Sequence, residues 1–202
     1  MLIRLYISLL SGAVFLAALM LVADSTDRIW QVGRASGVAA FVIMTMAVCF
    51  GLIQSSKALI KIRIMLQPTA LEIHRSLTWA GLTLVGVHAV TLLLIMGYTL
   101  TYTVGLGILA ACLIVLLIIT SELRNKIVSL KVWRTIHYSS FVCYLLFLVH
   151  GFSSGTDSRE PWMRALYITS LALVIGLASL RILNRINRAT LPKGLYRILQ
   201  VY

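Results

Sequence analysis

Charged residues are scarce in this chain. Only 12% of its 202 residues are charged, 60% are hydrophobic, and the mean hydropathy is +0.96. Soluble domains are about 25% charged and about 45–50% apolar, so this composition excludes an ordinary soluble protein. Acidic residues are fewest, with six Asp and Glu against 18 Lys and Arg. Because the basic residues flank apolar runs, the net charge of +12 indicates membrane topology rather than nucleic-acid binding.

Cysteine, proline and nucleotide-binding patterns are also rare or absent. The three cysteines, Cys49, Cys112 and Cys143, lie in apolar runs without C-x-x-C spacing, so we interpret them as small buried hydrophobic residues. The three prolines fall between the apolar runs, where they do not interrupt a helix. No G-x-G-x-x-G occurs and no strands alternate with helices, so these residues predict no dinucleotide-binding unit.

Six apolar runs are long enough to cross a bilayer as helices. They cover residues 5–23, 35–52, 74–96, 102–120, 135–153 and 162–183. The first run exceeds the apolar region of a signal peptide and lacks a clean A-x-A site, so we expect a retained helix. The sequence therefore predicts an all-α, polytopic membrane protein. Residues 1–183 would form one six-helix transmembrane domain, and residues 184–202 a basic tail along the cytoplasmic surface.

The distribution of basic residues predicts the orientation of these helices. Basic residues concentrate in the segments after the second and fourth runs and in the tail. They are Lys57, Lys61, Arg63 and Arg75, then Arg124, Lys126, Lys131 and Arg134, then Arg181, Arg185, Arg188, Lys193 and Arg197. The positive-inside rule places these segments and both termini in the cytoplasm. We expect a multi-pass protein of a prokaryotic plasma (inner) membrane.

All four histidines lie in two of the apolar runs, where ionisable side chains are costly and usually functional. His74 and His88 are fourteen residues apart, and His137 and His150 thirteen. At 1.5 Å per residue the members of a pair are about 20 Å apart, so one metal ion cannot bind both. The two runs cross in the same direction, which pairs His74 with His137 near the cytoplasm and His88 with His150 nearer the outside.

Two imidazoles at each level fit haem iron better than zinc. A closed zinc site needs four protein ligands, whereas a porphyrin supplies four nitrogens and leaves two axial positions. We therefore predict two stacked b-type haems, each with two histidine ligands and no open position, which favours electron transfer. Fourteen residues return to nearly the same helix face, but thirteen do not. His137 and His150 thus require either a local tightening of their helix or haems on different sides of it.

Two blocks carry a resemblance to a known family. They are LEIHRSLTWAGLTLVGVHAVTLL (residues 71–93) and KVWRTIHYSSFVCYLLFLVHGFSSGTD (residues 131–157). Their paired histidines, on a third and a fifth helix, resemble the ferric reductase-like transmembrane domain. That family includes NADPH oxidases, ferric reductases and the haem subunit of a bacterial methionine sulfoxide reductase system. The resemblance implies that His74 and His137 ligate an inner haem, and that His88 and His150 ligate an outer one.

The resemblance also implies a role for neighbouring residues. Arg75 and Arg134 lie at the level of the inner haem, where they bind a propionate or simply anchor the helices at the membrane surface. Aromatic side chains between the two levels either separate the haems or only pack the core; they are Phe141, Tyr144 and Phe147. The segment 151–162 next to the outer ligand is either a docking surface or a plain connector.

The expected function is a transmembrane cytochrome b, the haem subunit of an oxidoreductase. A cytoplasmic flavoprotein or a quinol would reduce the inner haem, and the outer haem would pass the electron to an extracytoplasmic redox protein or small acceptor. Flavin would come only through a partner, and quinone is a candidate ligand. The alternatives are a non-catalytic or structural subunit, packed through faces such as Gly105–Gly107, and a haem-free proton carrier. No acidic residue lies mid-span, which disfavours the carrier.

Overall fold

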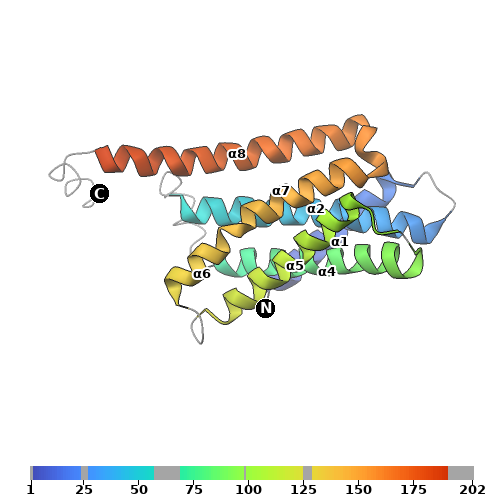
Figure 1. Ribbon diagram of the computed structural model, residues 1–202, viewed down its shortest axis with the longest axis horizontal. Helices are drawn as coiled ribbons and strands as arrows, with labels where there is room; N and C mark the ends of the chain where they lie inside the picture. The colour runs from blue at the N-terminus through green and yellow to red at the C-terminus, as the bar shows by residue number, and fades with distance from the viewer. Residues whose placement is uncertain (1, 24–26, 57–68, 98, 125–128, 191–202) are drawn as a thin grey trace.

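The computed structural model describes residues 2–23, 27–56, 69–97, 99–124 and 129–190, although not the side chains of residues 184–190. The described residues are helical and contain no strand. The elements are α1 (Leu2–Leu21), α2 (Arg28–Ser55), α4 (Ala70–Ala89), the π-helix η1 (Val90–Ile95), α5 (Tyr102–Glu122), α6 (Leu130–His137), α7 (Ser139–Ser154), the 3₁₀ turn η2 (Thr156–Arg159) and α8 (Pro161–Thr190). Figure 1 shows them as a bundle of long helices.

Six helical segments of the described chain are long and apolar enough to cross a membrane. The prediction of an all-α, six-helix membrane protein is therefore confirmed. α4 and η1 together form the third span, and α6 and α7 the fifth. α8 continues seven residues beyond the predicted end at residue 183, so the expected tail begins as helix. The rest of that tail, residues 191–202, lies outside the described residues, as do the loop cations Lys57, Lys61, Arg63 and Lys126.

Short polar side chains begin several of the helices. The Asp27 carboxylate accepts from the backbone amides of Ile29 and Trp30 at the start of α2, at 2.9 and 3.1 Å. The hydroxyl groups of Thr101 and Ser129 cap α5 and α6 in the same way. These caps satisfy amide groups that have no partner inside the helix. Pro161 opens α8, a position that needs no amide hydrogen.

The helix α2 is the centre of the bundle. It contacts α1, α4, α7 and α8, which surround it in Figure 1. Its buried positions include many small residues, among them Ala35, Ser36, Ala39 and Ala47. Small side chains let helix backbones approach closely, which is how helices associate in lipid. Because α2 supplies these close approaches, its backbone carbonyls come within reach of side chains on neighbouring helices.

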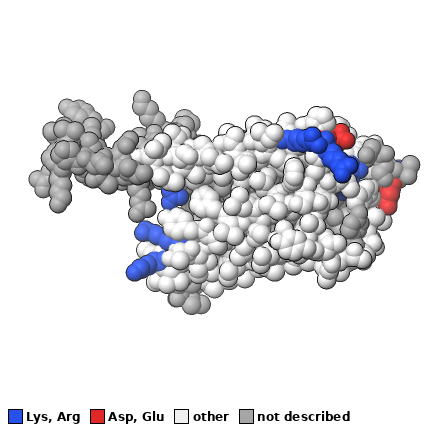
Figure 2. All heavy atoms as spheres, turned by 45° about the horizontal axis from the view of Figure 1, so that its top comes forward, with Lys and Arg blue, Asp and Glu red and all other residues white. Residues whose placement is uncertain are grey.

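The outside of the bundle has the character of a lipid-facing surface. Large apolar side chains are exposed on α1, α4, α5, α7 and α8. Figure 2 shows a wide flank without charge and charged side chains gathered toward the two ends of the molecule. Ion pairs occur at one end between Arg4 and Glu72 (3.6 Å) and between Arg75 and Glu122 (2.7 Å). The protein is therefore a multi-pass membrane protein by the length and surface of its helices.

Candidate functional site

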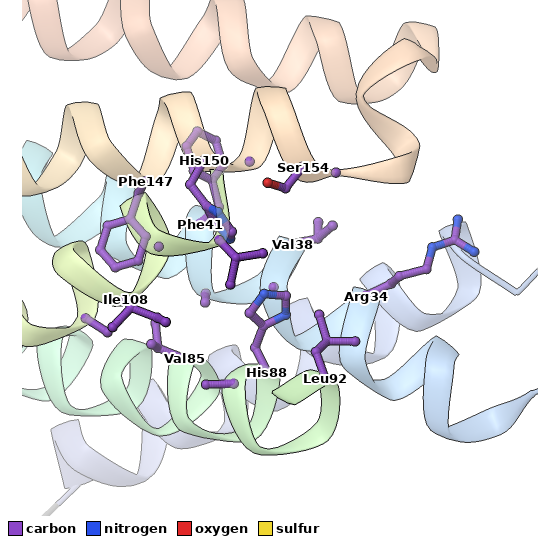
Figure 3. A pocket seen from close by; sticks show the side chains of 18 of the residues that line it. Arg34, Val38, Phe41, Val85, His88, Leu92, Ile108, Phe147, His150 and Ser154 are labelled. Atoms are coloured by element: carbon purple, nitrogen blue, oxygen red, sulfur yellow. The ribbon is translucent and has the colours of Figure 1, made fainter. Parts of the chain in front are cut away.

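The structure brings the four histidines together in the predicted pairs. The ring centroids of His74 and His137 are 6.2 Å apart, and those of His88 and His150 are also 6.2 Å apart. The ring planes cross at 68° in the first pair and 75° in the second. Each pair joins α4 to the fifth span. Figure 3 shows His88 and His150 pointing toward one another from α4 and α7.

The fifth span is interrupted between its two histidines. α6 ends at His137 and α7 begins at Ser139. Around Tyr138 the hydrogen bonding tightens, because the amide of Phe141 donates to the Tyr138 carbonyl three residues back (3.2 Å). A three-residue bond turns the chain further per residue than an α-helix does. A local tightening, one of the two alternatives that the sequence left open, is thus present directly after His137.

Three of the histidines have a backbone carbonyl at Nδ1. His74 bonds to the carbonyl of Ala47 at 2.9 Å, and His88 to that of Gly33 at 2.7 Å. His150 bonds to the carbonyl of Thr103 at 2.8 Å. Since a carbonyl only accepts, Nδ1 must carry the hydrogen in each ring, which leaves the lone pair on Nε2. Metal-binding histidines use this arrangement to fix the tautomer and the ring orientation.

His137 is held differently. Its Nδ1 is buried and has no hydrogen-bond partner among the described residues. Its ring stacks on Trp133, one helical turn earlier, with centroids 4.9 Å apart and planes 27° apart. The indole Nε1 of Trp133 donates to Ser121 on α5 at 3.2 Å. An aromatic stack therefore orients the ring that lacks a carbonyl.

Glycines on neighbouring helices lie against three imidazoles and make room for two of them. A β-carbon at Gly37 would lie 2.7 Å from Nδ1 of His88, and one at Gly107 would lie 2.8 Å from Cε1 of His150. At Gly51 the corresponding distance to Cε1 of His74 is 3.4 Å, an ordinary contact. The subunit alternative placed Gly107 on a face that could pack against a neighbouring chain, and the structure shows that Gly107 faces His150. No local pattern in the sequence indicates this contact, because the histidine lies on another helix.

Each histidine pair borders its own cavity. The His88–His150 cavity has a volume of about 680 Å³ and walls that are almost entirely apolar. The His74–His137 cavity has a volume of about 760 Å³. Phe147 is the one residue of the described chain that lines both. Of the three aromatic residues predicted between the levels, Phe141 and Tyr144 border only the His74–His137 cavity.

Cationic side chains border the His74–His137 cavity. Both predicted arginines, Arg75 and Arg134, are among them, together with Arg124 and Arg181. Arg75 forms an ion pair with Glu122, and the side chains of the two residues are 55% and 41% exposed. Arg124 lies over the Trp133 ring, 4.8 Å from its centroid. Arg124 and Arg181 were interpreted from the sequence only as topology signals, because neither lies next to a histidine along the chain.

A buried ion pair in the wall of the His88–His150 cavity was not predicted. Arg34 Nε donates to Asp157 Oδ2 at 3.0 Å, and a second nitrogen of Arg34 donates to the other carboxylate oxygen. The two side chains are only 9% and 11% exposed. The segment 151–162 is therefore folded onto the bundle, and Ser158 Oγ also bonds to the Gly151 carbonyl at 2.8 Å.

Among the described residues, no group of three or more His, Cys, Asp and Glu side chains is placed to hold a metal ion. Within the described part of the chain, neither histidine pair is therefore joined by a third such side chain at a position that could complete a metal site. Comparison of the chain with models of protein families, with curated proteins and with solved structures found no match. The family resemblance thus rests on the two histidine blocks, and the chemistry must be argued from the geometry.

Proposed function

We propose that the protein is a transmembrane cytochrome b that carries electrons through two haems, each held by two histidines. The observation that supports this most directly is the separation of the paired rings. Two metal–nitrogen bonds of about 2.0–2.1 Å, with about 1.1 Å from each nitrogen to its ring centre, place the centroids about 6.3 Å apart. Both pairs are separated by 6.2 Å. One iron atom between the two rings fits this distance.

The surroundings of the rings fit the same group. Nδ1 donates to a carbonyl in three of the four rings, so Nε2 is the free ligand atom. A cavity several hundred Å³ in volume adjoins each pair, the size of a typical cofactor site. Haem, when bound, would supply a one-electron couple in each cavity. His74 and His137 would hold the inner group, and His88 and His150 the outer one.

The protein residues then define a route across the membrane. The positive-inside rule puts the arginine-rich His74–His137 cavity and both termini on the cytoplasmic side. Phe147 lines both cavities and would lie between their contents. Arg75, Arg124, Arg134 and Arg181 would favour an anionic propionate at the inner group. A cytoplasmic flavoprotein or a quinol would be the donor, and an extracytoplasmic redox protein or small acceptor would take the electron.

The resemblance to the ferric reductase-like transmembrane domain leads to the same proposal. It makes the chain the haem subunit of an oxidoreductase in a prokaryotic plasma membrane, with flavin supplied by a partner. A second candidate is a haem-bearing subunit of a larger complex that passes no electron across the bilayer. The exposed apolar face of α5, for example at Leu109 and Leu116, would suit a neighbouring helix as well as lipid.

The experiment that tests the proposal measures haem and transport together. The protein is purified from a haem-supplied host, and its haem content and reduced spectrum are recorded. We expect two haems per chain and sharp b-type bands. In vesicles that enclose ferricyanide, external dithionite should then reduce the enclosed acceptor, whereas vesicles with the His88→Ala protein should not transfer. Protein without haem would overturn the proposal. Two haems without transfer would favour the non-conducting subunit.

A further inference from the structure

The Arg34–Asp157 ion pair borders the cavity of His88 and His150 and is linked to both histidines through the chain. Arg34 follows Gly33, whose carbonyl accepts from His88 Nδ1 at 2.7 Å. Asp157 lies in η2, seven residues after His150. One turn of α2 thus contacts one histidine directly and is joined by an ion pair to the segment that follows the other. Both charged residues also line the His88–His150 cavity.

The Arg34–Asp157 pair has the geometry and burial of an interior ion pair rather than of a surface one. Its two hydrogen bonds are parallel, the side chains are about nine-tenths buried, and Arg34 also lies over the Trp30 ring at 5.9 Å. Figure 3 shows Arg34 extending from α2 at the end of the cavity beyond Leu92. Burying two charges is costly, and many exposed ion pairs contribute little, so a buried bidentate pair indicates a specific role.

We propose that Arg34 and Asp157 are positioning residues of the outer haem site, and that each charge offsets the effect of the other on the reduction potential of that haem. This inference rests on the proposed function. The tie between α2 and η2 holds the carbonyl acceptor of His88 in register with the helix that carries His150. A cation near a haem stabilises the reduced form, and an anion stabilises the oxidised form. Together the two charges largely cancel, because they lie in contact.

The charge argument predicts opposite effects of two neutral substitutions. Asp157→Asn leaves the guanidinium without this carboxylate, so the midpoint potential of the outer haem should rise. Arg34→Gln leaves the carboxylate without this cation, so the potential should fall. In the double variant Arg34→Gln/Asp157→Asn it should return close to the wild-type value. A residue that served only to stabilise the fold would shift the potential in the same direction in both single variants, or not at all.

The experiment is a potentiometric titration of the purified protein followed at the b-type bands. The reduction step of the outer haem is identified by comparison with the His88→Ala protein, which should lack it. The reduction step of the inner haem, present in every sample, shows that the protein has folded. Glu72→Gln is the matched control, since it neutralises one member of an ion pair that borders neither cavity. If a single variant does not fold, the charge-reversed variant Arg34→Asp/Asp157→Arg must restore the outer haem.

Two failures are distinguishable. A wild-type protein without haem would contradict the proposed function, and this inference with it. A wild-type protein with two haems whose outer potential moves in the same direction in both single variants, or in neither, would overturn this inference alone. Failure of the charge-reversed variant to restore the outer haem would also overturn it.

Discussion

The two histidine cavities share their central geometry and differ in what surrounds it. Both pairs have centroids 6.2 Å apart. In the His88–His150 cavity both rings have a carbonyl acceptor, and the Arg34–Asp157 ion pair in the wall is buried. In the His74–His137 cavity one ring has a carbonyl and the other an aromatic stack, and the arginines include an exposed ion pair. The same ligand arrangement is thus held in two different ways.

The difference shows where each site is rigid. Backbone carbonyls of helices are fixed by the helix itself, so the outer rings have little freedom to turn. A stacked ring and exposed arginines adapt more easily, because solvent and side-chain rotation compensate for changes. We therefore expect the outer site to be sensitive to small changes in packing. The inner site should be sensitive mainly to the loss of a ligand.

The largest effect should come from the ligands themselves. His88→Ala should remove the outer haem and leave the inner one, and His74→Ala should do the reverse. Each variant would then hold one haem per chain, because the two sites share no ligand. Haem content and the reduced spectrum measure this. Retention of both haems in either variant would show that the pairing is wrong.

The next effect tests the packing at His150. Gly107→Ala places a β-carbon 2.8 Å from Cε1 of that ring, so the ring or α5 must move. Overpacking of a buried site costs about 1–3 kcal/mol, so the outer haem should bind roughly five- to 150-fold more weakly. Gly105→Ala is the control on the same helix, because nothing lies within 4 Å of its β-carbon. Equal haem loss in the two variants would point to α5 in general rather than to the ring.

A third prediction compares the two cavities directly. Gly37→Ala brings a β-carbon to 2.7 Å from His88 Nδ1, whereas Gly51→Ala brings one to 3.4 Å from His74 Cε1. The first should displace the ring and weaken outer haem binding, and the second should leave inner haem binding nearly unchanged. Low-spin electron paramagnetic resonance spectra report the orientation of the ligands in each case. A stronger effect at Gly51 would contradict the difference in rigidity.

The sequence predicted the ligand pairs but not their supports, for a physical reason. Span length and histidine spacing are local properties, so six helices and two levels follow from the chain alone. The Gly33 and Thr103 carbonyls carry no side-chain signal, and neither do the glycines against the rings. Arg34 and Asp157 are 123 residues apart, and only the tertiary fold brings them together. Such contacts depend on tertiary structure, which a single sequence with no aligned relatives does not encode visibly.

The smallest expected effect is that of replacing Arg75. It decides whether this residue binds a haem propionate or only anchors the helices at the membrane surface. Its guanidinium is already paired with Glu122 at 2.7 Å, and both side chains are largely exposed. Exposed ion pairs contribute about 0.2–1 kcal/mol, so Arg75→Gln should change inner haem retention by no more than about fivefold. Glu122→Gln should behave alike if the pair only anchors the helices. If Arg75 instead binds a propionate, Arg75→Gln should release much more inner haem than Glu122→Gln. Haem content of the two variants at increasing salt separates these outcomes, because the exposed pair alone is screened.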